Sequence, residues 1–213
     1  SYVAANTNRV RLGSSICLVP QRNPVYTAKQ ITDVDFLSGG RVDFGVGAGW
    51  LKEEFDALQV PFERRGARTS DYIRVMQALW TMERPSYHGE FYNLPECTQN
   101  PKPVQTPHPP IFFGGESKPA LRRVATQGQG WMGASMMPKD LPEKLALLDN
   151  LLAEHDRKRS DIKVYTLPNI APKADLFPQY EDLGVEQVIH LVPMKNIDDV
   201  HQRLDTMAKM AFG

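Results

Sequence analysis

The sequence predicts an α/β protein whose strands form a parallel sheet. Short, apolar, β-branched segments alternate with segments of helical periodicity, and six such strand–helix pairs follow one another along the 213 residues. Consecutive pairs of this kind join parallel strands through right-handed crossovers. An open doubly wound sheet and a (β/α)8 barrel both meet this description. Gly45, Gly47 and Gly49 form GxGxG instead of the GxGxxG fingerprint of dinucleotide-binding sheets, so no fingerprint favours the open sheet.

The composition is that of an ordinary globular chain. Lys plus Arg and Asp plus Glu are equal at 25 each, so no overall charge attracts nucleic acid or an anionic membrane. No apolar run reaches the roughly 18 residues of a membrane span. The two cysteines, Cys17 and Cys97, lack metal-ligand spacing and predict reduced thiols in a cytoplasmic protein. The five histidines form no pair at ligand spacing, so no metal site is predicted.

The first two strand–helix units have strands that end in small residues. Residues 9–16 are apolar and partly alternating, which predicts a strand, and apolar residues at helical spacing predict a helix over 25–37. The sequence SGG at 38–40 ends that helix as a glycine cap. Residues 41–47 predict the second strand, and a helical start over 51–58 follows it.

A long amphipathic helix is predicted over 69–82, because its apolar residues fall on one face. The arginines before and at its start, Arg64, Arg65 and Arg68, predict exposed ion pairs, with an anion contact as the alternative. The next residues, 83–109, predict an excursion over the surface. It begins with an aromatic hairpin and returns through NPKPVQTPHPP, which is too rich in proline for a helix or a central strand.

The remaining residues predict four further strand–helix pairs. The strands are short and apolar, and they cover 111–115, 130–133, 162–167 and 188–192. The helices carry apolar residues on one face, and they cover 117–126, 141–155, 174–183 and 197–210. His190 falls in the last predicted strand, where a hydrogen-bonded core histidine is favoured over one that faces a ligand.

Several motifs in a fixed order connect the chain with a known family. The first is LGSSICLVPQRNPVYTAKQITDVDFLSGGRVDFGVGAGW, with a strand before NP, an AK helix, a D-x-LSGGR turn and a GVGxGW loop. It is followed by FERRGARTSDYIRVMQALWT, YHGEFYNL, PKPVQTPHPPIFFGG and GQGW. In this order the motifs resemble the luciferase-like monooxygenase superfamily over nearly the whole chain. Within the superfamily, the chain is most similar to the branch whose members use the deazaflavin coenzyme F420.

The resemblance implies a (β/α)8 TIM barrel of luciferase-like type, with an excursion between the fourth and fifth strands, where 83–109 lies. It makes 1–213 a single domain in which 9–16 is the third barrel strand and SYVAANTN the end of the second helix. Six units are then visible where a closed barrel needs eight. We therefore expect two further βα units, about 60–90 residues, before Ser1, with a shortened relative as the alternative.

Active sites of such barrels lie at the carboxyl ends of the strands, and two strand ends are predicted to hold a cofactor ring. At the first, the family has a bulge, often with a cis peptide, that supports one face of the ring; the alternative is an ordinary serine turn. At the second, small residues admit a ring or polar tail, and the alternative is a tight loop with Trp50 packed on the rim. The predicted cofactor-binding residues at these two ends are Ser15, Ile16, Gly47, Ala48, Gly49, Trp50 and Glu53.

A third strand end, Phe113, Gly114 and Gly115, is implied by the resemblance to receive the cofactor phosphate. Backbone amides at a helix N-terminus bind phosphate without needing a lysine. The alternative is a glycine turn with Ser117 as the N-cap of the helix. Glu116 is an anion beside the proposed phosphate and counts against it unless its side chain points outward.

These observations predict an oxidoreductase that holds FMN or coenzyme F420 and moves hydride to or from a small organic substrate. With FMN, monooxygenation is a second reaction that the cofactor allows. The alternative is a catalytically inactive luciferase-like flavin-binding protein or a truncated remnant, because relatives draw substrate-facing residues from the two units not seen here. No residue is therefore assigned as catalytic. The resemblance also implies a homodimer, and neither nucleic acid nor a membrane is expected as a partner.

Overall fold

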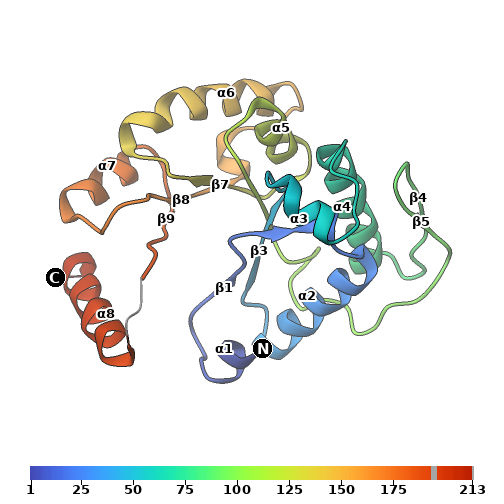
Figure 1. The fold of residues 1–213 in the computed structure, drawn as a ribbon, viewed down its shortest axis with the longest axis horizontal. Coiled ribbons are helices and arrows are strands. Elements are labelled where there is room, and N and C mark those ends of the chain that lie inside the picture. Colours follow the sequence, from blue (N-terminus) through green and yellow to red (C-terminus); the bar gives the residue numbers. More distant parts are fainter. Residues whose placement is uncertain (193–195, 213) are drawn as a thin grey trace. The chain divides into compact units, whose positions relative to one another are not determined.

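The computed structural model describes residues 1–192 and 196–212 (Figure 1). These residues form two compact units. The first consists of Ser1–Gly114 and Gln127–Gln129, and the second of Gly115–Thr126 and the chain from Gly130 onward. The boundary between the units thus falls inside the predicted phosphate-binding strand end. The single domain expected over 1–213 stays a prediction.

The first unit is built around one fully buried strand, β3 (Val42–Gly47). On one side it pairs in parallel with β1 (Leu12–Gly13) and β2 (Cys17–Leu18), and on the other with β6 (Ile111–Gly114). A strand that is buried on both faces in a parallel sheet reads as a continuous apolar run, which is why VDFGVG was recognisable from sequence.

The strand predicted over 9–16 is shorter than expected: only β1 lies in that range, and a bulge separates it from β2, which begins just after it. Leu12 pairs with Val42 and Cys17 with Val46. From Leu12 to Cys17 the chain advances five residues, whereas from Val42 to Val46 it advances four. The segment between β1 and β2 therefore contains one residue more than the part of β3 that it faces. Such a bulge bends the strand and redirects its side chains. It is the bulge that the family resemblance implied at this position.

Helix α2 (Pro24–Ser38) ends at the glycine cap that its sequence predicts and begins at a side-chain cap that was not predicted. The Oδ1 atom of Asn23 accepts hydrogen bonds from the backbone N–H groups of Val25 and Tyr26, at 3.0 and 3.2 Å. At the other end Gly39 adopts the left-handed conformation, with φ of 66°. The short helix α1 (Tyr2–Ala5) and the 3-10 turn η1 (Val19–Gln21) complete the segment around it.

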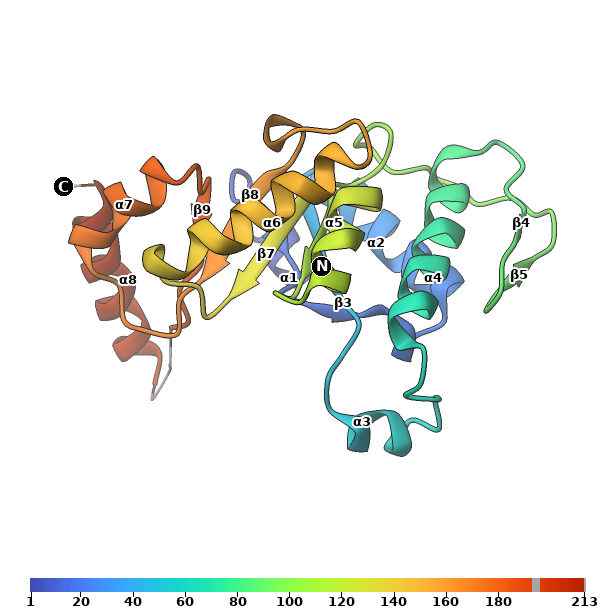
Figure 2. The same ribbon diagram turned by 90° about the horizontal axis from the view of Figure 1, so that it is seen from above.

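Helix α4 (Arg65–Thr81) begins one turn earlier than predicted and packs on α2 (Figure 2). The indole Nε1 of Trp80 donates a hydrogen bond to the carbonyl oxygen of Ala28 at 3.1 Å, so the long helix is anchored at its far end. Between β3 and α4 the chain projects outward through the short helix α3 (Lys52–Ala57). The earlier start of α4 matters for the site, because it places Arg65 in the first turn.

The excursion over 83–109 is held to α4 by one buried carboxylate. Its hairpin consists of β4 (Tyr87–His88) and β5 (Asn93–Leu94), which are antiparallel as predicted. The Asp71 carboxylate accepts hydrogen bonds from the hydroxyl of Tyr87 at 2.6 Å and from the backbone N–H groups of Phe91 and Tyr92 at 2.9 and 3.1 Å. Backbone groups that a loop cannot pair with itself are thereby satisfied.

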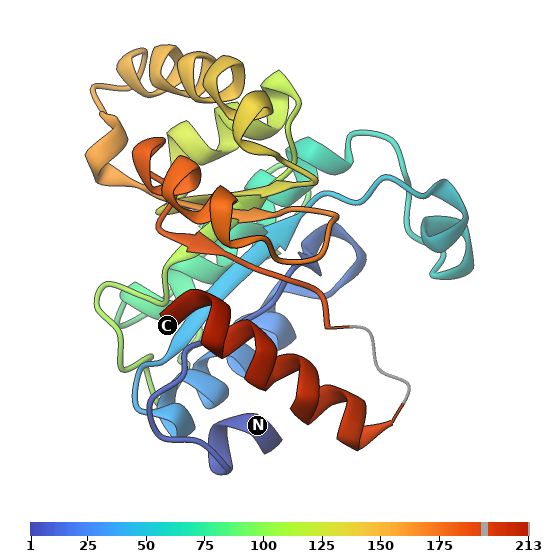
Figure 3. The same ribbon diagram turned by 90° about the vertical axis from the view of Figure 1, so that its left-hand side faces the viewer.

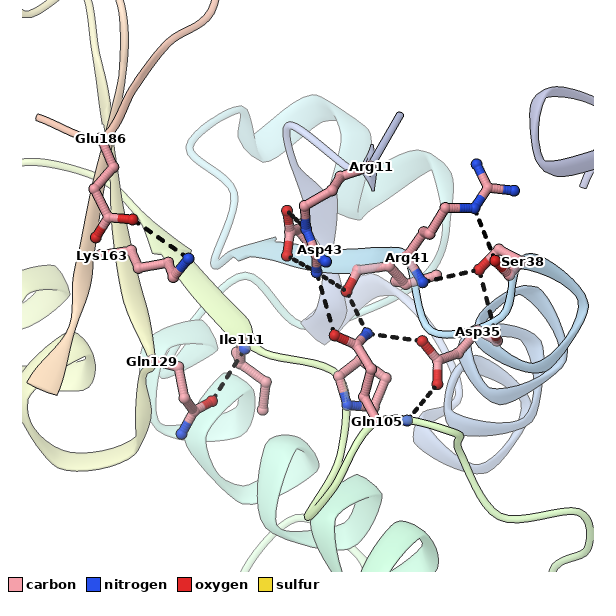
Figure 4. Close-up of polar contacts among 12 residues, drawn as sticks. Arg11, Asp35, Ser38, Arg41, Asp43, Gln105, Ile111, Gln129, Lys163 and Glu186 are labelled. Carbon is pink, nitrogen blue, oxygen red and sulfur yellow. Dashed lines mark hydrogen bonds and ion pairs between the residues drawn. The ribbon is translucent and has the colours of Figure 1, made fainter. Parts of the chain in front are cut away.

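The proline-rich return is held to α2 by a second buried carboxylate (Figure 4). Asp35 accepts hydrogen bonds from the backbone N–H groups of Val104 and Gln105, at 2.8 and 3.1 Å, and from the Gln105 side-chain amide at 2.7 Å. The same amide donates to the Val42 carbonyl at 2.7 Å. The aspartate of the D-x-LSGGR motif therefore joins α2, β3 and the excursion.

The second unit has three parallel strands, β7 (Gly130–Ala134), β8 (Lys163–Leu167) and β9 (Gln187–Val188), drawn from yellow to orange in Figure 3. Buried leucines of α6 face its core. Its helices are α5 (Lys118–Gln127, whose last residue belongs to the first unit), α6 (Leu141–Ala153), α7 (Phe177–Asp182) and α8 (Ile197–Phe212). Three 3-10 turns are η2 (Pro138–Asp140), η3 (Arg159–Asp161) and η4 (Ala174–Leu176).

The strand predicted over 188–192 was wrong in length, and residues 193–195 lie outside the described part. The Ile189 N–H still donates to the Thr166 carbonyl at 2.7 Å. The next ladder bond would need an N–H from Pro168, which proline lacks, so the pairing ends. His190 consequently lies after β9 and not within a strand.

Candidate functional site

In the first unit, the bulge and the ends of β3 and β6 meet at the side chain of Ile16. A Cβ atom built on Gly47 would lie 1.9 Å from Cδ1 of Ile16, and one built on Gly114 would lie 3.2 Å from the same atom. A side chain at Gly47 would therefore displace the end of the Ile16 side chain, and one at Gly114 would press against the same atom. Ile16 is nevertheless 37% exposed, so it lies over two strand ends and still presents apolar surface to solvent.

The bulge itself is held by backbone and hydroxyl contacts to β3. The hydroxyl of Ser14 donates a hydrogen bond to the Gly45 carbonyl at 2.8 Å. The Ser15–Ile16 peptide is cis, as the resemblance implied, and Ser15 is exposed. The next residue, Cys17, is half-buried, and this burial raises the pKa of its thiol, with Arg22 acting in the opposite direction.

The loop after β3 is shaped by Gly49. Its φ is +79°, and a Cβ there would lie 2.8 Å from Cε2 of the Phe55 ring. Its carbonyl oxygen accepts a hydrogen bond from Nε of Arg65 at 2.8 Å. Ala48 is half-buried, whereas Trp50 is 80% exposed, so the alternative that packs Trp50 on the rim was wrong for the described residues.

The two remaining predicted residues of the first unit differ in exposure. Glu53 lies in the first turn of α3 and is exposed, one turn beyond the loop as predicted. Phe113 pairs with Val46 in the sheet and is only 1% exposed, so its side chain belongs to the core. Only the backbone of Phe113 is left to face a ligand.

In the second unit, Gly115 and Glu116 precede α5 and contact β7. Gly115 has φ of +107°, and its carbonyl accepts a hydrogen bond from Nε1 of Trp131 at 3.0 Å. The Glu116 carboxylate accepts the backbone N–H of Ala134 at 2.7 Å, so its charge is directed to the end of β7. Ser117 caps α5 as the alternative predicted, with its Oγ atom 3.4 Å from the Ala120 nitrogen.

The three arginines at the start of α4 were predicted to form exposed ion pairs, and two of them do not. Arg64 forms the expected exposed ion pair, with Glu90. Arg68 is 7% exposed, and it donates from Nη1 to the Pro61 carbonyl at 2.6 Å. Arg65 is half-buried and binds the glycine loop. The Arg-Gly pair at 65–66 marks the first turn of α4 in the sequence. Nothing in the sequence shows that this turn folds back onto Gly49.

Other candidate groups do not add to the site. Within residues 1–192 and 196–212, no group of three or more His, Cys, Asp or Glu residues could hold a metal ion. His190 was predicted to be hydrogen-bonded in the core, but neither ring nitrogen has a partner among the described residues. Its ring makes an edge contact with Phe177 at 6.2 Å between centroids. Each helix in the same ranges is too short or too polar to cross a bilayer.

Comparison with known proteins identifies the family. The model of the family described as luciferase-like monooxygenase matches residues 1–176, which is most of the chain. The chain belongs to the luciferase-like monooxygenase family. An uncharacterized protein of Mycobacterium tuberculosis is 32% identical to this luciferase-like chain over 206 residues, which cover 96% of the chain and 72% of the relative.

Two further proteins show the range of the family. An FMNH(2)-dependent dimethylsulfone monooxygenase of Pseudomonas putida is 37% identical over 130 residues, covering 60% of this luciferase-like chain and 35% of that enzyme. A solved F420-dependent secondary alcohol dehydrogenase, in complex with an F420-acetone adduct, matches with a TM-score of 0.81 at 14% identity. That match covers 100% of this chain and 82% of the dehydrogenase, so the fold is α/β of luciferase-like TIM-barrel type, of which the chain forms part.

Proposed function

We propose that this chain carries the ring-supporting part of an oxidoreductase that uses FMN or coenzyme F420 and acts on a small organic substrate. The observation that carries the proposal is the position of Ile16. It lies on Gly47 and Gly114 at the ends of neighbouring strands and keeps 37% of its surface exposed. An exposed apolar support of this kind suits an aromatic ring better than a polar substrate.

The residues around Ile16 suit a ring system with a polar edge. Ser15 is exposed, and the loop Gly47–Trp50 follows on the neighbouring strand, with Glu53 one turn beyond it. These residues would hold the ring and orient its polar edge. When bound, the group would supply hydride transfer in the case of F420 and, in the case of FMN, oxygen chemistry as well.

The turn before α5, in the second unit, suits a phosphate less well than the surface at Ile16 suits a ring. Gly115 allows close approach of the backbone, and the amino end of α5 favours an anion. However, Glu116 brings a carboxylate to the same turn, and Pro119 removes one N–H donor from the first turn of α5. We therefore expect ring contacts to contribute more of the affinity than phosphate contacts.

The decisive experiment compares ligands with and without phosphate on the purified 213-residue chain. Fluorescence titrations use FMN and riboflavin, and F420 and its phosphate-free deazaflavin, each oxidised. Saturable binding of one ring pair, with riboflavin retaining most of the FMN affinity, supports the proposal. If none of the four ligands binds, the proposal is wrong. Binding without any hydride transfer to or from small alcohols or aldehydes favours the inactive flavin-binding alternative.

The proposal also includes a homodimer in the cytoplasm. Its support is that α2 exposes three large apolar side chains, Tyr26, Phe36 and Leu37, at 75%, 54% and 67% exposure. Apolar side chains gathered on one element indicate an interaction surface when they are contiguous. Light scattering of the eluted chain should give twice the mass of 24.0 kDa, and a monomer over the micromolar range would contradict it.

A further inference from the structure

We propose that Arg65 is a positioning residue that fixes the ligand-binding conformation of the glycine loop after β3. The inference rests on the proposed function for the meaning of that loop, but the contacts that support it lie wholly within the first unit. They connect four residues of the segment between β3 and α4 and the first turn of α4: Gly49, Phe55, Phe62 and Arg65.

The first contact is the hydrogen bond from Arg65 to the loop. Nε of Arg65 lies 2.8 Å from the Gly49 carbonyl oxygen, across 16 positions of sequence. Gly49 has φ of +79°, a conformation that glycine can leave at little steric cost. A loop with such freedom keeps one conformation only if its neighbours hold it, and a charged donor forms a stronger bond to a carbonyl than a neutral one.

The second set of contacts holds Arg65 in place. Its guanidinium carbon lies 3.9 Å from the centroid of the Phe62 ring, and Phe62 meets Phe55 edge to face at 5.2 Å between centroids. Phe55 is fully buried and lies beneath Gly49. The Arg65 guanidinium thus packs on Phe62, Phe62 packs on Phe55, and Phe55 lies beneath Gly49. Together these contacts fix Arg65 more firmly than its hydrogen bond to the loop would alone.

Arg65 forms no ion pair with any of the described residues. Within the described ranges no carboxylate lies within ion-pair distance of it, whereas the adjacent Arg64 pairs with Glu90 and contacts Phe91 at 5.1 Å. The Arg65 backbone is also fixed, because its carbonyl accepts the Thr69 hydroxyl at 2.8 Å in the first turn of α4. Arg64 is therefore a matched control: the same residue type, one position away, without contact to Gly49.

The test uses Arg65→Gln, Arg65→Lys and the control Arg64→Gln in the 213-residue chain. Amide hydrogen exchange without any ligand reports the segment that holds the loop, through the amides of Leu58 and Val60, which donate to the Glu54 and Phe55 carbonyls at 3.1 and 3.0 Å. We expect these two amides to exchange at least about fivefold faster in Arg65→Gln, because the substitution removes both the bond to Gly49 and the contact with Phe62. Arg65→Lys should recover part of the protection and Arg64→Gln all of it. Urea midpoints serve to separate this local effect from global destabilisation.

Riboflavin titration is the second readout, because riboflavin tests the ring site without phosphate. Arg65→Gln should weaken its binding at least about fivefold, again with Arg64→Gln unchanged. Equal exchange rates in wild type and Arg65→Gln, or equal effects of the two arginine substitutions, would overturn the inference. If the wild type binds no flavin or deazaflavin, the proposed function fails, while faster exchange confined to the Arg65 variants still supports the positioning role.

Discussion

Ile16 occupies the space that any side chain on Gly47 would need. The distance from Cδ1 of Ile16 to a Cβ built on Gly47 is 1.9 Å, far below van der Waals contact. Any side chain at the end of β3 must therefore move the end of Ile16, whether or not a ligand approaches it.

Gly47→Ala should therefore destabilise the chain and displace Ile16. We expect a loss of about 1–3 kcal/mol in the free energy of unfolding, typical of overpacking, measured by urea denaturation. Adding Ile16→Ala should remove most of that loss. Gly13→Ala is the control, since its added Cβ meets only the Asp43 carbonyl oxygen at an ordinary 3.7 Å. Equal losses at both glycines would contradict the packing explanation.

The buried carboxylate of Asp35 should be important for stability. Asp35 is 0% exposed and accepts three hydrogen bonds from Val104 and Gln105. Asp35→Asn replaces an acceptor with a donor facing N–H groups, and we expect a loss of roughly 2–4 kcal/mol. Asp33→Asn on the same helix removes an exposed pair with Lys29 and should change stability by less than about 0.5 kcal/mol. Urea midpoints of both variants provide the comparison.

Stability should decrease below pH 6.5 because of His108. This ring is 8% exposed and packs on Trp80, and burial lowers its pKa, with the bond to the Pro109 carbonyl acting in the opposite direction. The unfolded chain then binds a proton at a higher pH than the folded one, so the stabilisation is complete above the unfolded pKa and decreases as pH falls through it.

Urea midpoints between pH 5.5 and pH 8 measure this effect. His108→Gln should flatten the profile in that range, even if it lowers stability at every pH. The exposed His155 is the control, and His155→Gln should leave the profile as it is in the wild type. A slope that survives His108→Gln would assign the pH dependence to other groups.

The charge of Glu116 should reduce phosphate affinity at the proposed site. Glu116→Gln keeps an oxygen that can accept the Ala134 N–H but removes the negative charge. We expect FMN binding to strengthen about two- to fivefold, because a unit charge a few ångströms from phosphate is worth about 1 kcal/mol in water. Riboflavin binding should not change, and neither affinity should respond to Glu143→Gln on α6. Equal gains for both ligands would contradict a phosphate at this turn.

Much of the fold could be predicted from the sequence where local signals were strong. The continuous apolar run of β3, the Gly39 cap of α2 and the hairpin of the excursion all lie where predicted. Each depends on side chains close together along the chain. The bulge and its cis peptide were reached only through family resemblance, because the extra residue exists only relative to the register of β3.

The alternation of elements, the positions of the strand-end glycines and the family could therefore be recognised without the structure. The packing of those glycines became visible only in the folded chain: Gly47 and Gly114 make room for Ile16, and Gly49 is held by Arg65. The fold also decided that Phe113 belongs to the core and that β9 stops opposite Pro168. The physical reason is common to all of these cases. Local propensity depends on neighbours in sequence, whereas close packing and hydrogen-bond partners depend on residues that the fold brings together from distant positions.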